Sequence, residues 1–297
     1  MSKKVYLDEL VTPQRYSYSA EKAPYPQCWP NGKGLAVYIA MNLEHFAFDT
    51  QEGAKLSTHA NYPDVLNYSW RDYGNRVGAW HLAELFDSLS IPPAVIANTA
   101  ILDYCPQLLD RWLAIPGSEL IAHGHTNSQR QGELEEDDES LLIATCQQRL
   151  NHYLKKEVKG WLSPWISESF STPELLVKHQ FSYTLNWAHD DIPTLFNTEN
   201  GPLIAIPYPQ EINDIPTIIP NGASIETFCQ MVHDQFEELL SRSQHTPQVM
   251  GIALHPYIVG QPFRFHRLKK VLHTILDRRN EYWLTTPGEI AALYEDQ

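Results

Sequence analysis

The feature that most constrains the fold is a series of short apolar segments that each end in polar residues. The run from Leu35 to Met41 has the length of a strand and is continuously apolar, as in a strand buried on both faces. Potentially reactive side chains follow six such segments: Asn42 and Glu44, Asn98, His123, Ser163, Asp190 with Asp191, and His255. Parallel strands in a barrel bring their carboxyl ends together, so this pattern predicts an enzyme.

Helical periodicity alternates with these strands along the whole chain. We expect strands at 35–41, 93–98, 119–122, 159–162, 183–187, 203–206, 249–254 and 282–285, and helices at 75–89, 104–114, 133–156, 172–179, 224–242, 264–279 and 287–294. Seven or eight strand–helix units without a linker predict a single α/β barrel domain over residues 31–297. The segments 46–74 and 188–222 exceed normal loop length and are expected to be lids or substrate walls.

Residues 1–30 show no sustained period and are rich in proline and tyrosine. We interpret them as an extended arm that lies on the barrel, held by the aromatic residues Tyr16, Tyr18, Tyr25 and Trp29. The acidic run 133–139 opens a predicted helix that finishes at Lys155 and Lys156. Acidic residues at the start of a helix and basic residues at its end are stabilised by the helix dipole. We therefore expect the acidic run to be a solvated first turn and not a ligand-binding cluster.

Charge and cysteine content narrow the classes of function. The formal net charge of -14 and the pI near 5.3 argue against a nucleic-acid partner, because nucleic-acid modules usually carry a basic face. The four cysteines contain no C-x-x-C pair, which indicates buried thiols in a reducing compartment. With neither a signal-peptide pattern nor an apolar run of membrane-spanning length, we expect a cytoplasmic protein without a membrane partner.

His255 is the strongest catalytic candidate among these residues. Its strand delivers it to the barrel top, and Pro256 stops the strand there. An imidazole at that place can pass a proton to a leaving group near neutral pH. The alternative is a core histidine that hydrogen-bonds a backbone carbonyl, and position alone does not separate the two.

The segments around Glu44, His123 and Asp190 offer further chemistry. Glu44 can act as a base or a ligand, and the pair His123 and His125 is weak evidence for a metal site, because catalytic zinc usually has three protein ligands. Asp190 could orient a histidine, although capping a turn is the commoner role.

Aromatic rings near strand ends, including Trp165, Trp187 and Tyr257, could wall a pocket or simply pack under the lids. No serine-nucleophile or nucleotide-binding signature occurs.

Taken in order, the motifs resemble those of the polysaccharide deacetylase superfamily. They are Asn42-Leu-Glu44, His123-Gly, Gly160-Trp-Leu-Ser-Pro164-Trp, Trp187-Ala-His-Asp190-Asp191 and Ala253-Leu-His255-Pro. The chain is most similar to the cytosolic branch with cofactor-independent allantoinases and peptidoglycan-deacetylase-like proteins. This resemblance implies a distorted (β/α)7 barrel and hydrolysis of a C–N bond in an amide or N-acetyl group.

The chain departs from the metal-dependent pattern of that family. The usual aspartate pair is replaced by Asn42-Leu43-Glu44, and the His-x-x-x-His motif has Asn127 in place of its second histidine. An amide oxygen is a far poorer zinc ligand than an imidazole. Ser163 precedes the proline of the third motif, where the family carries an arginine, while the general-acid histidine of the last motif is retained as His255.

These observations predict a hydrolase acting on a non-peptide C–N bond of a small amide, ureide or N-acetyl substrate. The expected catalytic set is Glu44 as base, His255 as acid and Asp190 as the orienting partner. The expected substrate-binding residues are Asn42, Asn127, Trp165, Trp187 and Tyr257, with Asn42 and Asn127 donating to the oxyanion. If zinc or another divalent ion binds, its ligands would be Glu44, His123 and His125.

Two alternatives stay open beside this prediction. One is a zinc-dependent deacetylase of an N-acetylated sugar, and the other is an inactive barrel that binds a saccharide or a protein. No organic cofactor is expected. By analogy with relatives, the chain could form a homo-oligomer, although no sequence feature establishes one.

Overall fold

The computed structural model describes residues 12–18, 27–48 and 50–294. One curled sheet runs through it in the order β6-β7-β5-β4-β3-β2-β1-β8, and β9 also pairs with β1. All pairs are parallel except the hairpin of β6 and β7. The strand bounds are β1 (Leu35–Leu43), β2 (Pro93–Ala97), β3 (Glu119–Ala122), β4 (Gly160–Trp161), β5 (Tyr183–Thr184), β6 (Thr194–Thr198), β7 (Gly201–Ala205), β8 (Gln248–Leu254) and β9 (Trp283–Leu284).

The sheet is a half-barrel, because no ladder among the described residues joins β8 to the hairpin end. Loop backbone lies along the free edge of β8 instead: Val249 N donates to Asp191 O at 2.8 Å, and Ala253 N donates to Ile212 O at 3.0 Å. The predicted distorted barrel architecture is confirmed, with this open seam as its distortion. The seam matters for the site because it fixes residues 212–214 beside the end of β8.

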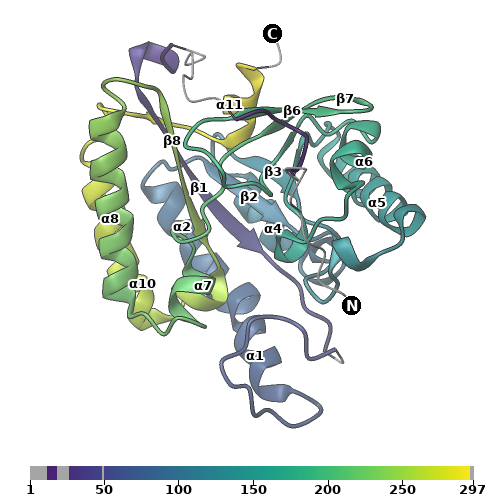
Figure 1. Ribbon diagram of the computed structural model, residues 1–297. Helices are drawn as coiled ribbons and strands as arrows, with labels where there is room; N and C mark the ends of the chain where they lie inside the picture. The colour runs from purple at the N-terminus through teal and green to yellow at the C-terminus, as the bar shows by residue number, and fades with distance from the viewer. Residues whose placement is uncertain (1–11, 19–26, 49, 295–297) are drawn as a thin grey trace, which may run out of the picture.

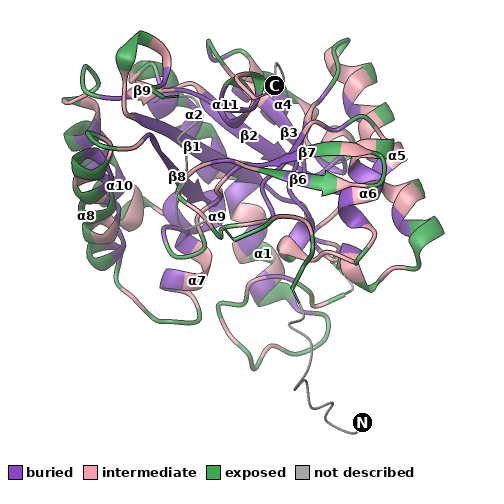
Figure 2. Ribbon diagram, turned by 45° about the horizontal axis from the view of Figure 1, so that its top comes forward, coloured by how far each residue is buried: buried purple, intermediate pink, exposed green. Residues whose placement is uncertain are grey.

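Helices cover the outer face of the sheet (Figure 1). Their bounds are α1 (Val65–Tyr73), α2 (Ala79–Ser88), α3 (Ile101–Tyr104), α4 (Pro106–Leu113), α5 (Glu136–Leu154), α6 (Thr172–Lys178), α7 (Asp214–Ile218), α8 (Ile225–Arg242), α9 (Pro256–Val259), α10 (Pro262–Leu276) and α11 (Pro287–Ala292). In Figure 1, α8 and α10 lie together on one flank and α5 and α6 on the opposite one. Figure 2 shows most strands buried, exposed residues in the β6–β7 hairpin, and exposed outer faces of the helices, as expected for amphipathic helices packed on a sheet.

The two long segments expected to be irregular contain regular elements. Segment 46–74 carries α1, which begins at an N-cap where the Asp64 side chain accepts from Asn67 N. Segment 188–222 carries the β6–β7 hairpin and the short helix α7, which Asn213 caps by accepting from Ile215 N. α1 projects from the body in Figure 1 on the side toward which β1 points. Segment 46–74 and helix α7 therefore lie at the carboxyl end of the sheet, whereas the turn of the β6–β7 hairpin lies at the amino end of β7.

The acidic first turn of α5 is only partly solvated. Glu139 is fully buried, and its carboxylate accepts from Gln131 Nε2 at 2.7 Å and from Ser169 Oγ at 2.5 Å. Thr172 Oγ1 also donates to it. The expectation of a solvated run was thus wrong for Glu139, because the side chain ties the loop after β4 to α5.

The described part of the amino-terminal arm contacts the body. Arg15 forms an ion pair with Glu174 at 2.6 Å, and the Tyr16 ring stacks on Phe196 at 5.3 Å between centroids. Trp29 is buried and donates to Gln248 O, whereas the Tyr18 side chain is 92% exposed. Tyr25 lies outside the described residues, and the division of the chain at residue 30 stays a prediction. No helix in the described ranges is both long enough and apolar enough to span a bilayer.

Candidate active site

A pocket of about 250 Å³ opens at the carboxyl ends of the strands. Asn42 and Glu44 reach it from β1, His123 from the end of β3, and His255 from the end of β8. Apolar side chains form much of its wall, among them Phe46, Leu162, Ile166, Ile215 and Pro216. The polar lining includes Asn127, Ser163, Trp165, Tyr208 and Tyr257. Residues far apart in the sequence thus meet at the place that the strand-end pattern indicates.

Glu44 lies at the centre of the polar groups. Its Oε1 accepts from Asn127 Nδ2 at 2.5 Å and lies 3.5 Å from Nε2 of both His123 and His255. Its Oε2 accepts from Tyr257 OH at 3.1 Å. Burial alone would raise the pKa of Glu44, but the charge of His255 and the close contacts with both histidines outweigh it and lower the pKa to about 2. Glu44 is therefore a carboxylate at neutral pH.

His255 is held from behind by Asp214, at the start of α7. The His255 Nδ1 and the Asp214 Oδ1 are 2.6 Å apart, and the His255 backbone N donates to Asp214 Oδ2 at 2.8 Å. Burial disfavours the charged imidazole, but Asp214 and Glu44 together raise the pKa of His255 to about 10. The proton of this buried triad therefore resides on His255, between two carboxylates.

His123 presents one ring nitrogen to the pocket without a hydrogen-bond partner. Its Nδ1 lies 2.7 Å from Leu162 O, and a carbonyl can only accept, so Nδ1 carries the hydrogen. Nε2 is buried, has no hydrogen-bond partner, and lies on the Glu44 side. Buried polar atoms are rarely left unpaired, so this nitrogen indicates a place for a water or a substrate group.

Asn98 fixes the orientation of the Asn127 amide. Asn98 Nδ2 donates to Asn127 Oδ1 at 2.9 Å, while Asn98 Oδ1 accepts from His45 N at 2.8 Å. Because Oδ1 of Asn127 is thereby occupied, its NH₂ group faces Glu44 and the pocket. Asn127 thus offers hydrogen-bond donors at the position where a metal-binding family member has an imidazole.

Asn42 has a different role from the one expected. Its Nδ2 donates to Tyr208 OH at 3.1 Å and to Leu254 O at 3.2 Å. Both amide hydrogens face acceptors of the protein, which leaves none for a substrate oxygen. Asn42 therefore lines the floor and holds Tyr208, rather than donating to an oxyanion.

The loop after β4 forms a wall of the pocket in a strained conformation. Trp165 and Ile166 both adopt left-handed backbone angles, with φ of 63° and 54°. Each such residue costs about 1–3 kcal/mol and persists only where its surroundings hold it. Trp165 Nε1 donates to Asn127 O at 2.9 Å, and Arg130 lies 4.4 Å over the indole ring. This loop is held where it can wall the pocket.

Three of the residues predicted for the site lie elsewhere. His125 turns away, with its Nδ1 2.9 Å from Thr99 Oγ1, in a separate hollow beside α5. Asp190 caps its own turn by accepting from Asp191 N at 2.8 Å. Trp187 packs against Phe196 and donates to Glu168 Oε2. Side-chain direction in a turn depends on tertiary contacts, which explains why strand-end position misplaced these three.

Asp214, the orienting carboxylate, was missed by sequence reasoning. It lies 41 residues before His255, inside a segment expected to be irregular. The pair Asn213-Asp214 ahead of a short apolar stretch is a helix N-cap pattern that could have marked a helix start there. Asn98 ends a predicted strand, but its link to Asn127 had no local signal.

The metal ligands expected from the resemblance do not come together. Glu44 Oε1 and His123 Nε2 are 3.5 Å apart, near the roughly 3.4 Å between two ligands that each lie about 2.1 Å from one tetrahedral zinc. No third ligand completes the set, because Asn127 offers its NH₂ and His125 points away. The described residues contain no group of three or more His, Cys, Asp or Glu side chains that could hold a metal ion. The residues present therefore do not fit a three-ligand zinc site.

No protein-family model matches the chain, but curated proteins do. A Schizosaccharomyces pombe protein, provisionally named a polysaccharide deacetylase, is 22% identical over 292 residues, which cover 89% of this chain and 91% of the relative. The peptidoglycan deacetylase of Helicobacter pylori is 22% identical over 247 residues, which cover 72% and 82% of the two chains.

Solved structures share the fold. The crystal structure of PuuE allantoinase superposes with a TM-score of 0.79 at 22% identity, covering 91% of this chain and 93% of that chain. At this identity the structural likeness establishes the fold alone. The curated relatives and the solved structures together point to the polysaccharide deacetylase superfamily, with allantoinase-like and peptidoglycan-deacetylase-like neighbours.

Proposed function

We propose that the protein is a hydrolase of a non-peptide C–N bond in a small amide, ureide or N-acetyl substrate. The observation that carries the proposal is the buried chain Asp214, His255, Glu44, which places a cationic acid beside an anionic base in one pocket. A hydrolase of this class also fits the names of the neighbours, which are deacetylases and an allantoinase.

In the proposed first step, water attacks the substrate carbonyl carbon and Glu44 accepts its proton. The unpaired Nε2 of His123 and Oε1 of Glu44 give this water two acceptors within reach. The Asn127 amide has a second hydrogen beyond the one that Glu44 accepts, and this hydrogen would stabilise the oxyanion.

In the second step, the C–N bond breaks and His255 protonates the leaving nitrogen. His255 carries the required proton because Asp214 and Glu44 raise its pKa. Asp214 is a positioning residue, since it touches His255 and fixes the ring with Nε2 toward Glu44. Tyr257 holds the second Glu44 oxygen and keeps the carboxylate aimed at the water.

The test is turnover of a panel of cyclic ureides, linear ureides and N-acetylated sugars, read as released amine or ammonia. We expect turnover of at least one class, and a loss of about 10²–10⁴-fold in kcat/KM for His255→Gln. Folding of the variant is checked by circular dichroism. Full activity of folded His255→Gln would reject the assigned acid.

A zinc-dependent deacetylase is the second candidate, and the His123–Glu44 pair is the observation that favours it. Chelation followed by zinc addition separates the two candidates. Activity that chelation removes and zinc restores would support the metal enzyme. Activity that survives chelation would support acid–base hydrolysis by Glu44 and His255.

We also propose that the protein works in the cytoplasm, because all four cysteines are free thiols. The expectation that they are buried holds only for Cys146, since Cys28 is exposed and Cys105 and Cys229 are partly exposed. Assembly into a homo-oligomer stays a prediction, and light scattering of the purified chain would measure it. Neither proposal bears on the chemistry of the pocket.

A further inference from the structure

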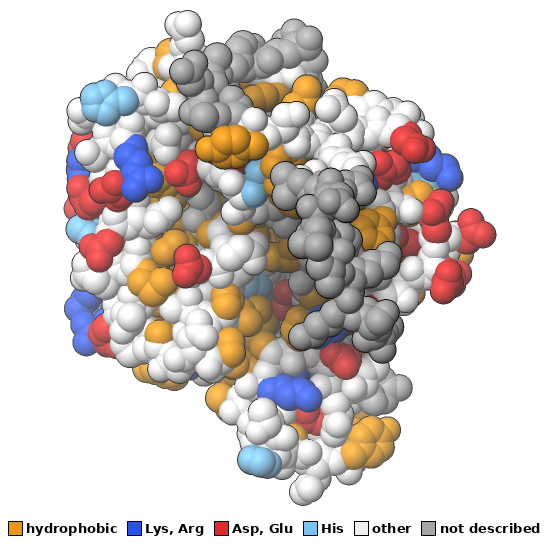
Figure 3. All heavy atoms as spheres, in the orientation of Figure 1, with side chains coloured by type: hydrophobic (Ala, Val, Ile, Leu, Met, Phe, Trp, Pro, Cys, Tyr) orange, Lys and Arg blue, Asp and Glu red, His pale blue; other side chains and the backbone are white. Residues whose placement is uncertain are grey.

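The described residues that line the site pocket include one carboxylate, Glu44, and two histidines, but neither lysine nor arginine. A second carboxylate, Asp214, lies directly behind His255. The His255 ring therefore lies between two carboxylates, Glu44 and Asp214. In Figure 3, apolar side chains gather around the middle of the face shown, while acidic and basic side chains lie mainly over its flanks.

A buried cation, Arg71 of α1, lies one layer behind the pocket wall. Its guanidinium carbon is 4.6 Å from the centre of the Phe46 ring, and its Nη1 donates to Ala54 O at 3.0 Å. Both Phe46 and Ala54 line the pocket, whereas Arg71 does not. Arg71 is only 3% exposed, and its Nε has no hydrogen-bond partner. The guanidinium therefore has an unused donor that Phe46 separates from the pocket.

This arrangement makes the pocket unfavourable for an anion. A substrate carboxylate would lose its hydration and lie near Glu44, while the imidazole of His255 already pairs with the two carboxylates of Glu44 and Asp214; an unpaired buried charge is strongly disfavoured. A neutral amide avoids that cost and can still accept a hydrogen bond from the second amide hydrogen of Asn127. The pocket is also small, since about 250 Å³ is below the roughly 300–1,000 Å³ typical of sites for drug-sized ligands.

We propose that the site selects uncharged amides or ureides about the size of one ring, and that Phe46 determines this selectivity by covering Arg71. The inference rests on the proposed function for the reaction but concerns binding, which can be measured without turnover. Phe46 is then a specificity-determining residue, and the pocket should bind compact substrates in preference to polymers.

The first test uses matched ligands that differ only in charge. Hydantoin-5-acetamide and hydantoin-5-acetate have nearly the same shape, and N-acetylglycinamide and N-acetylglycine form a linear pair. Titration calorimetry on the wild-type protein should give at least tenfold tighter binding of the neutral member. Equal or tighter binding of the carboxylate, or no binding of either member in both pairs, would overturn the proposal.

The second test removes the cover from Arg71. Phe46→Ala should reduce the preference for the neutral member at least fivefold, while Phe46→Leu, which keeps an apolar cover, should retain it. Because Phe46 is buried, both variants are first checked for a cooperative thermal transition. Gln210→Arg, at an exposed position on the pocket rim, gives the same reduction without touching the core, and Gln210→Leu is its control. An unchanged preference in both Phe46→Ala and Gln210→Arg would contradict the charge argument.

Size is tested with N-acetylglucosamine and its tetramer. The monomer should bind at least as tightly as the tetramer, and a tetramer bound more than tenfold tighter would contradict the compact-substrate claim. Neutral ligands that bind preferentially but are never hydrolysed would reject the proposed hydrolase and leave this inference standing. Hydrolysis of both charge types at equal kcat/KM would reject the inference and leave the hydrolase standing.

Discussion

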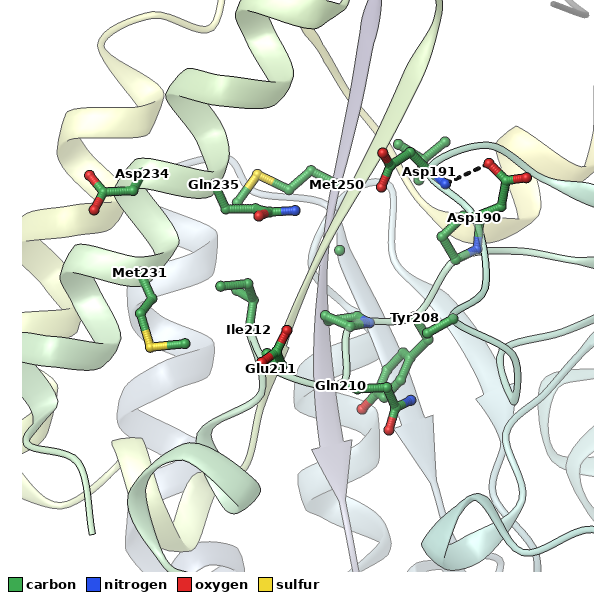
Figure 4. Close-up of a pocket in the computed structure, with 15 residues that line it drawn as sticks. Asp190, Asp191, Tyr208, Gln210, Glu211, Ile212, Met231, Asp234, Gln235 and Met250 are labelled. Atoms are coloured by element: carbon green, nitrogen blue, oxygen red, sulfur yellow. Dashed lines mark hydrogen bonds between the residues drawn. The ribbon is translucent and has the colours of Figure 1, made fainter. Parts of the chain in front are cut away.

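Two hollows of this molecule share Tyr208 and Gln210 but differ in what they bring together. The site pocket, at the strand ends, has a volume of about 250 Å³, while the hollow along β8 and α8 has about 530 Å³. The larger hollow is lined by four carboxylates, Asp190, Asp191, Glu211 and Asp234 (Figure 4). In Figure 4 Asp190 and Asp191 come from one loop, Glu211 from another and Asp234 from α8, and the hydrogen bond drawn between Asp190 and Asp191 is a local turn contact.

The difference shows that size and carboxylate content are poor guides to chemistry here. In the smaller pocket the ionisable groups are buried and touch one another, so each alters the protonation of the next. In the larger hollow the side chains of Asp191, Glu211 and Asp234 are exposed, so water screens their charges from one another. We therefore expect catalysis in the smaller pocket. Substitutions in the smaller pocket should then reduce activity far more than substitutions in the larger hollow.

The largest effect is expected from Glu44→Gln. The variant keeps the shape but removes the base, so kcat/KM should fall by about 10³-fold or more. Asp190→Asn, in the larger hollow, should change kcat/KM by less than about twofold. Steady-state kinetics of both variants on one substrate checks this. A larger loss of activity in Asp190→Asn than in Glu44→Gln would place the catalytic residues in the larger hollow instead.

Asp214→Asn should lower kcat by about 10²–10³-fold. The amide removes the charge that keeps His255 protonated, so the pKa of His255 falls and the alkaline limb of the rate profile moves to lower pH. Asp191→Asn is the matched control from the larger hollow. An alkaline limb that stays in place in Asp214→Asn would exclude Asp214 as the positioning residue.

The wild-type pH dependence has a defined sign. Because the pKa of His255 is raised to about 10, kcat should stay level through neutral pH and fall only as pH rises toward 10. The stability that His255 contributes is complete below its unfolded pKa of about 6.5 and is lost as pH rises through the folded value. Melting temperatures between pH 6 and pH 10 should thus drop more in the wild type than in His255→Gln. Parallel curves would argue against a cationic His255.

The sequence predicted the strands other than β6, and most helices, because continuous apolar runs and helical periods are local signals. For the same reason it placed Asn42, Glu44, His123 and His255 at strand ends that meet. Asp214 was not predicted because its hydrogen bond to His255 depends on how the loop backbone runs along the open edge of β8. His125, Asp190 and Trp187 were misplaced because a turn sets side-chain direction only through its contacts.

The smallest effect is expected from Asn98→Ala. Without Asn98, the Asn127 amide can turn its oxygen toward Glu44, so kcat should fall about tenfold with little change in KM. Asn200→Ala, in the exposed turn of the β6–β7 hairpin, is the control and should behave as wild type. A change in KM alone would show that Asn98 acts on binding and not on the orientation of Asn127.

The most direct test of the central claim is kcat/KM of the wild-type protein, after exhaustive chelation, on the best substrate of the panel, beside Glu44→Gln. We expect the chelated wild type to retain its kcat/KM, and the kcat/KM of the folded Glu44→Gln variant to fall by about 10³-fold or more. Activity that disappears with the metal, or a Glu44→Gln variant as active as the wild type, would contradict hydrolysis by the Glu44–His255 pair.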